Sequence, residues 1–326
     1  MSNLNSTNLM ISVFEEMSLL DIKSAKDVMV VSNEDRILPL DSKGFWLEND
    51  LCVCFGPAGV GKSIFAVGLA AEISKTLKEK VVYFDFELSD REFMLRFTRD
   101  FLGDYFFRGR PSNEDLMTTD GKRMAQIIEQ IYLEKKIKYF VVDNISIILD
   151  DPTNYDKAKR FILEFKGLVD KYQDMSILLV GHTPKRDMAA PISSDSLAGS
   201  KALTNFCKSA FAIIQSVKGS NIIYVKQVKT RNGECLYDAN NVLVYTLIRE
   251  KGNLLFKELG TGKESDHLYT ARNTNLKENE VRDEMIIKLY NQTKSTREIS
   301  KILLEKKGIR ISHTAVNQVV RRKFKK

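Results

Sequence analysis

The chain has 326 residues and a formal net charge of +7, and its 43% hydrophobic and 29% charged residues favour a globular protein over a disordered one. No apolar run approaches the ~18–20 residues that span a bilayer, so no membrane partner is expected. Four cysteines are too few for a disulfide scaffold, and the first residues lack the features of a secretory signal, so the cytoplasm is the expected compartment.

Short apolar runs alternate with longer helical patterns from about residue 45 to residue 258, after a weakly periodic start in which residues 8–24 can form an amphipathic helix. Buried strands are expected at 51–55, 80–86, 138–143 and 175–181, and helices at 63–78, 91–102, 118–136 and 154–172. This alternation predicts the α/β class, with a parallel sheet covered by helices on both faces. Three further runs predict a meander at the sheet edge, at 221–228, 241–248 and 253–259.

The end of the chain differs in composition from its body. Residues 260–279 are polar and rich in breakers, which predicts a linker. From Lys277 to Lys326 there are 14 Lys or Arg and six Asp or Glu, a net charge of +8, whereas the remaining 276 residues sum to −1. A basic end on a nearly neutral body favours a nucleic-acid partner, although a charge run that only aids solubility is the alternative. We expect an N-terminal segment that can join subunits (1–35), a main domain (36–259), a linker (260–279) and a C-terminal domain (280–326).

Residues 56–63 match the P-loop pattern G-x-x-x-x-G-K-[ST] between a predicted strand and a predicted helix. Glycines let backbone N–H groups face phosphates, and the following helix points the positive end of its dipole at the same anion. Lys62 can reach the β- and γ-phosphates, and the Ser63 hydroxyl can hold Mg²⁺. We therefore predict ATP and Mg²⁺ as cofactors, and the residues expected at the nucleotide are Gly56, Pro57, Ala58, Gly59, Val60, Gly61, Lys62, Ser63 and Ile64.

The apolar run 138–143 ends in Asp143, the arrangement called Walker B, in which a strand-end carboxylate helps to hold the magnesium ion. Asp143 is a better candidate than Asp150 or Asp151. An ordinary strand-end aspartate is the alternative.

Two further strand ends resemble those of the RecA superfamily. The stretch 83–90 places Glu87 at the end of the strand after the P-loop helix, where the superfamily has a glutamate that polarises the attacking water. Asp85, two residues earlier on the same face, is the alternative base. The run 175–181 leads into His182, and the RecA and DnaB branches carry a polar residue here that senses the γ-phosphate. A strand-end histidine bonded to the backbone is the alternative interpretation.

Two later segments resemble DnaB-type and plasmid RepA-type helicases. Residues 184–207 lack apolar periodicity, and the corresponding loop in that family lines a central channel and grips single-stranded DNA; this implies phosphate contacts from Lys185, Arg186 and Lys201. Residues 226–234 resemble the family's K-x-R-x-G segment, which implies that Lys229 and Arg231 reach the γ-phosphate of a neighbouring subunit in a ring of six. A mobile surface loop and a simple hairpin turn are the alternatives.

The three helical segments within 280–322 resemble a helix-turn-helix domain. The third has valines on one face and polar or basic residues on the other, and its expected contacts with duplex DNA are Asn317, Gln318, Arg321 and Arg322. A three-helix module for protein contacts is the alternative.

The resemblance to these ATPases and helicases, which covers about residues 40–250, implies a RecA-like P-loop ATPase core, and the resemblance to a helix-turn-helix domain adds a small all-α C-terminal domain. The implied function is that of a hexameric DNA motor, a RepA-type helicase of a plasmid or mobile element. A recombination or transposition ATPase on duplex DNA, a KaiC-like regulatory ATPase and a non-enzymatic DNA-binding module stay open as alternatives.

Overall fold

The computed structural model describes residues 38–110, 119–149, 151, 154–183, 187, 189–196, 201–231, 233–293, 295–307 and 309–324. The helix predicted at 8–24 and two predicted DNA contacts, Lys185 and Arg186, lie outside the described residues. None of the described helices combines the length and the apolar character that a membrane span requires.

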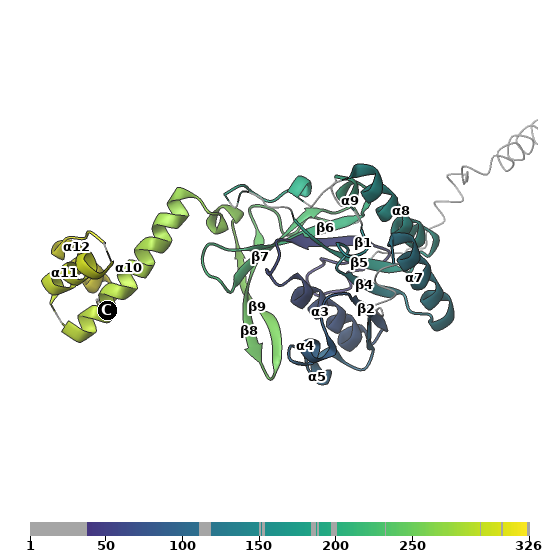
Figure 1. Cartoon of the computed structure of the whole chain (residues 1–326), viewed down its shortest axis with the longest axis horizontal. Coiled ribbons are helices and arrows are strands. Elements are labelled where there is room, and N and C mark those ends of the chain that lie inside the picture. The colour runs from purple at the N-terminus through teal and green to yellow at the C-terminus, as the bar shows by residue number, and fades with distance from the viewer. Residues whose placement is uncertain are drawn as a thin grey trace, which may run out of the picture. The chain divides into compact units, whose positions relative to one another are not determined.

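One sheet organises the described part of the main domain, with the strand order β3-β2-β4-β5-β1-β6-β7-β8-β9 (Figure 1). The pairs from β3 to β6 are parallel, and those from β6 to β9 are antiparallel. The strand bounds are β1 Leu51–Gly56, β2 Val81–Asp85, β3 Phe106–Gly109, β4 Tyr139–Asp143, β5 Ser176–His182, β6 Ser209–Gln215, β7 Ile222–Lys229, β8 Val242–Glu250 and β9 Asn253–Gly262. The predicted parallel sheet with an antiparallel edge is therefore confirmed.

Helices cover both faces of this sheet, with α3 on one side and α7, α8 and α9 on the other (Figure 1). Each face of the sheet packs against its helices through a cluster of buried apolar side chains. Successive residues of β1 belong to opposite clusters: Val53 packs with α7 and α8, and Cys54 packs with α3. This alternation is the period of two that a strand buried on both faces requires. The helix bounds are α3 Lys62–Glu72, α4 Asp90–Met94, α5 Arg99–Leu102, α7 Gly121–Lys135, α8 Tyr155–Lys171 and α9 Lys201–Phe206.

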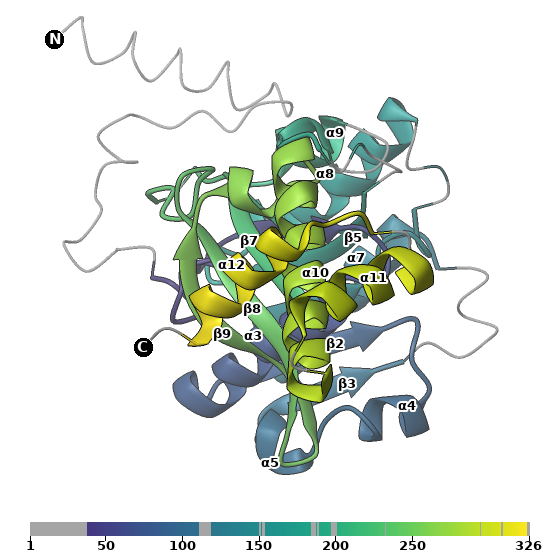
Figure 2. The same cartoon turned by 90° about the vertical axis from the view of Figure 1, so that its left-hand side faces the viewer.

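Several elements differ from the sequence prediction. The helix expected over 91–102 is two short helices, α4 and α5. The break comes at Thr98, whose hydroxyl caps the start of α5 and donates a hydrogen bond to Oδ1 of Asn253, a residue at the tip of the β8–β9 hairpin. Strands β3 and β6 were not predicted; β3 has only four residues and lies beside β2 at one edge of the sheet (Figure 2). The predicted linker 260–279 contains the end of β9, the 3-10 helix η3 (Glu264–His267) and the first turns of α10.

The last part of the chain forms three helices, as expected: α10 (Ala271–Thr293), α11 (Thr296–Lys307) and α12 (His313–Phe324). Their apolar side chains form a cluster of their own, centred on Ile286, Leu303 and Val316. Ser295 accepts a hydrogen bond from the Glu298 N–H at the start of α11, and Ser312 accepts one from the Ala315 N–H at the start of α12. These two serines satisfy N–H groups that a helix start leaves without partners.

A buried ion pair joins the sheet to the segment that leads into α10. Lys226 on β7 lies 2.6 Å from Glu264 on η3, and the side chains are 12% and 2% exposed. Glu264 also accepts from the Ile192 N–H at 2.8 Å, and Lys226 donates to the Ile192 carbonyl at 2.8 Å. The pair therefore holds the backbone of Ile192, which belongs to the segment predicted to bind DNA.

Replacing Lys226 with Met leaves the Glu264 carboxylate buried without its cation. We expect Lys226→Met to lower the free energy of unfolding by about 3–5 kcal/mol, measured by urea denaturation. Lys43→Met removes a half-exposed pair with Glu258 and is the control, with an expected cost of about 0–1 kcal/mol. Equal losses in the two variants would contradict this account of the buried pair.

Candidate active site

The P-loop takes a conformation that its glycines make possible. Gly59 and Gly61 have φ angles of +76° and +95°. A Cβ on Gly61 would lie 2.6 Å from the ring of Phe256 on β9, and one on Gly56 would lie 2.1 Å from the Ile213 carbonyl oxygen. Helix α3 begins directly after Gly61, and no side chain caps its start. Its first N–H groups are thus available to an anion in the loop.

Lys62 and His182 meet inside the loop. Lys62 Nζ donates to the Pro57 carbonyl at 2.8 Å and to His182 Nδ1 at 3.0 Å. An ammonium only donates, so this contact places the proton of a neutral imidazole on Nε2. Burial lowers the pKa of Lys62, and burial together with the nearby ammonium lowers the pKa of His182. A phosphate reaching the loop would meet both groups.

The Asp143 carboxylate and the Ser63 hydroxyl lie next to each other. Asp143 is the last residue of β4 and is 4% exposed; its carboxylate accepts hydrogen bonds from the Tyr83 and Ser63 hydroxyls. Burial raises the pKa of Asp143 to about 6. Magnesium in phosphate sites is held by one or two protein oxygens together with phosphate oxygens and water, which these two residues fit. The described residues contain no cluster of three or more acidic, His or Cys side chains that would suggest a different metal.

Glu87 lies two residues beyond the end of β2, next to Asn144 and His182. Asn144 Nδ2 donates to Glu87 Oε1 and lies 3.1 Å from His182 Nε2, which is 3.9 Å from Glu87 Oε1. The Ser146 N–H donates to Asn144 Oδ1 at 2.8 Å, which fixes the orientation of the amide. Asn144 thus lies between Glu87 and His182, two residues predicted from separate strand ends, and its amide nitrogen is bonded to the Glu87 carboxylate. Sequence reasoning missed Asn144, whose only signal is its place directly after Asp143.

These side chains line one cavity of about 540 Å³, together with Ser63 and Gly59. Two arginines that the sequence analysis did not single out, Arg96 and Arg249, also line it. They come together because the β8–β9 hairpin docks on the turn between α4 and α5: Leu254 N–H donates to the Arg96 carbonyl at 2.7 Å, and Arg249 donates to the Leu95 carbonyl at 2.9 Å. No local pattern predicts such a contact between distant segments.

The predicted trans-acting residues lie outside this cavity in their own chain. Lys229 Nζ donates to the carbonyls of Asn205 and Cys207, at 2.9 and 2.7 Å, and to that of Thr204, at the end of α9. Arg231 is exposed and donates to the Asn205 carbonyl at 3.0 Å.

The other predicted DNA contacts that the structure describes lie on α9 and α12. Lys201 is exposed and lies 3.4 Å from Asp195. On α12, Gln318, Arg321 and Arg322 are exposed, and Asn317 is partly exposed. Arg322 lies 3.8 Å from Asp283 on α10.

The comparisons with known proteins agree with this architecture. Residues 24–188 match AAA_25, a family described as an AAA domain. Among solved structures, the chain is similar to one described as an ATPase domain, with a TM-score of 0.52 and 13% identity over 76% of this chain and 97% of that one. It is equally similar, at a TM-score of 0.52 and 13% identity, to a DnaB-like replicative helicase studied with its interactions with primase, over 78% of this chain and 72% of that one. No curated protein matches the chain. These likenesses show a RecA-like ATPase fold.

The raised pKa of Asp143 predicts that this carboxyl lowers the free energy of unfolding by an amount that depends on pH. Between about pH 4 and pH 6 the folded state keeps a proton that the unfolded state releases, so stability falls as pH rises through this window and stays lower above it. We expect Asp143→Asn to be more stable than wild type at pH 7, with a gain of up to about 3 kcal/mol that vanishes near pH 4. Urea denaturation of both proteins without nucleotide or Mg²⁺ measures this difference.

Burial also raises the pKa of Asp41 and of Asp50, so these carboxyls add to the pH dependence of stability in both proteins. Their contributions cancel when the stability of wild type is subtracted from that of Asp143→Asn. A difference in stability that does not change with pH would contradict the assignment to Asp143.

Proposed function

This chain belongs to the AAA_25 family of AAA domains, and from this membership and the geometry of the cavity we propose that it is an ATP-hydrolysing DNA motor. In its specific form the proposal is a hexameric, RepA-type helicase of a plasmid or mobile element that moves along single-stranded DNA. The observation that carries the proposal is the convergence of Lys62, Asp143, Glu87 and His182 in one cavity at the ends of four parallel strands. The similarity in fold to a DnaB-like replicative helicase supports it.

The residues of the cavity divide the chemistry between them. Lys62 and the start of α3 bind the β- and γ-phosphates, while Ser63 and Asp143 hold the magnesium ion, which offsets charge on the phosphate oxygens when bound. Glu87 accepts a proton from the water that attacks the γ-phosphate. Asn144 orients the Glu87 carboxylate by donating a hydrogen bond to its Oε1. His182 accepts a hydrogen bond from Lys62 and lies beside Asn144, so it is placed to respond to the γ-phosphate.

Arg231 is the better candidate of the two proposed trans-acting residues. Lys229 has three carbonyl partners at the end of α9, which would all have to be released for it to reach a neighbour. Arg231 has one hydrogen-bond partner among the described residues, the Asn205 carbonyl, and its side chain is exposed. We therefore assign the contact with the neighbouring subunit's γ-phosphate to Arg231, and to Lys229 the role of holding α9 against β7.

ATP turnover and the unwinding of a forked DNA duplex test the proposal together. We expect Lys62→Ala and Arg231→Ala each to lose strand separation, and Arg231→Ala to lower ATP turnover by about 10³-fold because the transferred phosphoryl group loses a cation. Arg99→Ala removes an exposed pair with Asp104 outside the cavity and is the control, with turnover expected within about twofold of wild type.

Mixing the Lys62 and Arg231 variants should restore part of the turnover, because a mixed ring contains interfaces with one intact copy of each residue. Turnover that single-stranded DNA does not raise but intact duplex does would replace the helicase with a recombination-type ATPase. Slow turnover that ignores DNA altogether would favour a regulatory ATPase.

The C-terminal helices are proposed to bind duplex DNA through α12. We expect Arg321→Ala and Arg322→Ala to weaken duplex binding and each to reduce the slope of log affinity against log salt by about 1, as measured by fluorescence anisotropy at several salt concentrations. Lys301→Ala, on α11 and paired with Glu305, is the control. Duplex affinity that is the same in wild type and in both α12 variants would contradict a DNA-binding role for this helix.

A further inference from the structure

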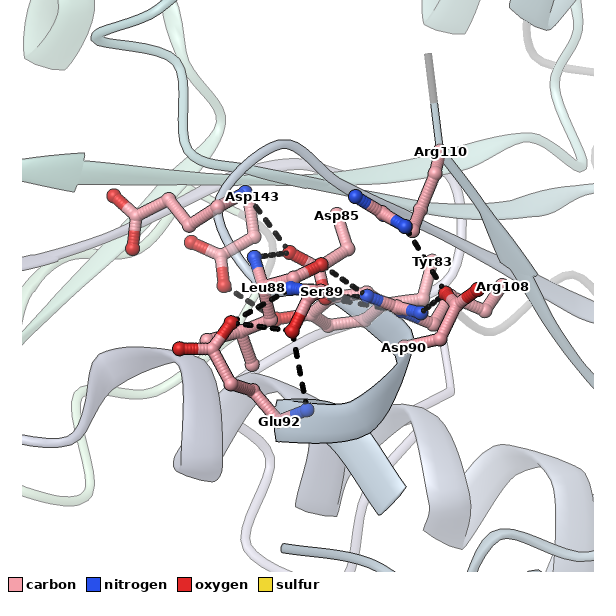
Figure 3. Close-up of polar contacts among 10 residues, drawn as sticks. Tyr83, Asp85, Leu88, Ser89, Asp90, Glu92, Arg108, Arg110 and Asp143 are labelled. Carbon is pink, nitrogen blue, oxygen red and sulfur yellow. Dashed lines mark hydrogen bonds and ion pairs between the residues drawn. The ribbon is translucent and has the colours of Figure 1, made fainter. Parts of the chain in front are cut away.

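Asp85 and Arg108 form an ion pair beside Leu88, in the turn that follows β2 (Figure 3). The same turn carries Glu87. Asp85 is the last residue of β2, and Arg108 lies on the neighbouring edge strand β3. The two side chains are 3% and 13% exposed, so solvent screens this pair little. Arg108 does not line the cavity, and its effect on the reaction has to pass through the turn.

One carboxylate oxygen of Asp85 accepts hydrogen bonds from the backbone, and the other accepts them from the Arg108 guanidinium. Its Oδ1 accepts from the Glu87 N–H at 3.0 Å and from the Leu88 N–H at 2.9 Å. Its Oδ2 accepts from Arg108 Nε at 3.0 Å and Nη2 at 2.8 Å. Asp85 therefore has no free oxygen for a water in the cavity, and its bonds fix the backbone on both sides of Glu87.

Arg108 holds the same turn from its other side. Its Nη2 donates to the Leu88 carbonyl at 2.6 Å, and its Nη1 donates to Asp90 at 2.6 Å. The guanidinium also lies 4.4 Å from the centre of the Phe93 ring. A planar group with five N–H donors can serve these acceptors at once, which a lysine cannot do.

We propose that Arg108 and Asp85 are positioning residues for Glu87, which keep its carboxylate at the distance from the γ-phosphate that hydrolysis requires. This inference rests on the proposed function, in which Glu87 is the general base. The Glu87 side chain itself has one described hydrogen-bond partner, Asn144, so the backbone of the turn determines where it lies. A shift of about 1 Å in a reacting group can cost about 10²-fold in rate, so loosening this turn should lower turnover without affecting ATP binding.

Steady-state kinetics of ATP hydrolysis test the proposal with Arg108→Gln. We expect kcat to fall by about 10- to 100-fold while KM and the Kd for ATP change by less than about threefold. Arg110→Gln is the matched control, because Arg110 bonds to the same Asp90 at 3.2 Å without touching the turn at Glu87. Arg108→Lys keeps the charge but not the planar fork and should be intermediate, and Asp85→Asn should show the same split between kcat and KM.

A double-mutant cycle with Glu87→Gln separates positioning from an independent effect. If Arg108 acts through Glu87, Arg108→Gln should lower the residual turnover of Glu87→Gln by less than about twofold. The proposal would be overturned if kcat of the double variant fell by the product of the two single-variant factors. It would also be overturned if Arg108→Gln lost as much affinity for ATP as it lost in kcat.

Hydrogen exchange of the Glu87 and Leu88 amides gives a readout that does not need activity. We expect faster exchange at these two amides in Arg108→Gln and no change in Arg110→Gln, with thermal unfolding showing that both variants are folded. Unchanged exchange would overturn the proposal whatever the kinetics show. Full turnover in Glu87→Gln would instead contradict Glu87 as the base and leave the exchange result to decide whether the ion pair holds the turn.

Discussion

The parallel register of four strands is the constraint on which the site depends. Gly56 at the end of β1 pairs with His182 at the end of β5, and Asp85 at the end of β2 pairs with Asp143 at the end of β4. Because parallel strands end at the same edge of a sheet, residues that follow these four strands can line one cavity. The P-loop, the proposed magnesium ligands, the proposed base and the proposed sensor are thus neighbours although up to 126 residues separate them in the chain.

That space is costly for ions in the absence of nucleotide. Burial acts against the charge of both Lys62 and Asp143, lowering the pKa of the lysine and raising that of the aspartate. A triphosphate brings negative charge to Lys62, and a magnesium ion brings positive charge to Asp143. Binding of the two therefore offsets the free energy that it costs to bury these charged groups in the folded protein. The site is therefore more complementary to its proposed ligand than to water, and nucleotide binding should also stabilise the fold.

Sequence reasoning succeeds where the determinant is local and fails where it is not. The P-loop is a contiguous motif, and the strands that end at Asp143 and His182 are apolar runs with a polar last residue, so their places could be predicted. Arg108 contributes through β3, a four-residue edge strand without a hydrophobic pattern. Arg249 enters the cavity only because the β8–β9 hairpin docks on Leu95, 154 residues earlier in the chain. Contacts of this kind depend on tertiary packing, which periodicity does not encode.

The stretch of sequence that contains the proposed DNA contacts Lys185 and Arg186 is flanked by His182 and Ile192, and both of these residues are held by partners in the main domain. At one end His182 is bonded to Lys62 in the P-loop, and at the other Ile192 is held by the buried pair of Lys226 and Glu264. In the proposed motor, a γ-phosphate that displaced His182 would therefore break its contact with Lys62, while Ile192 would stay attached to β7 through Lys226.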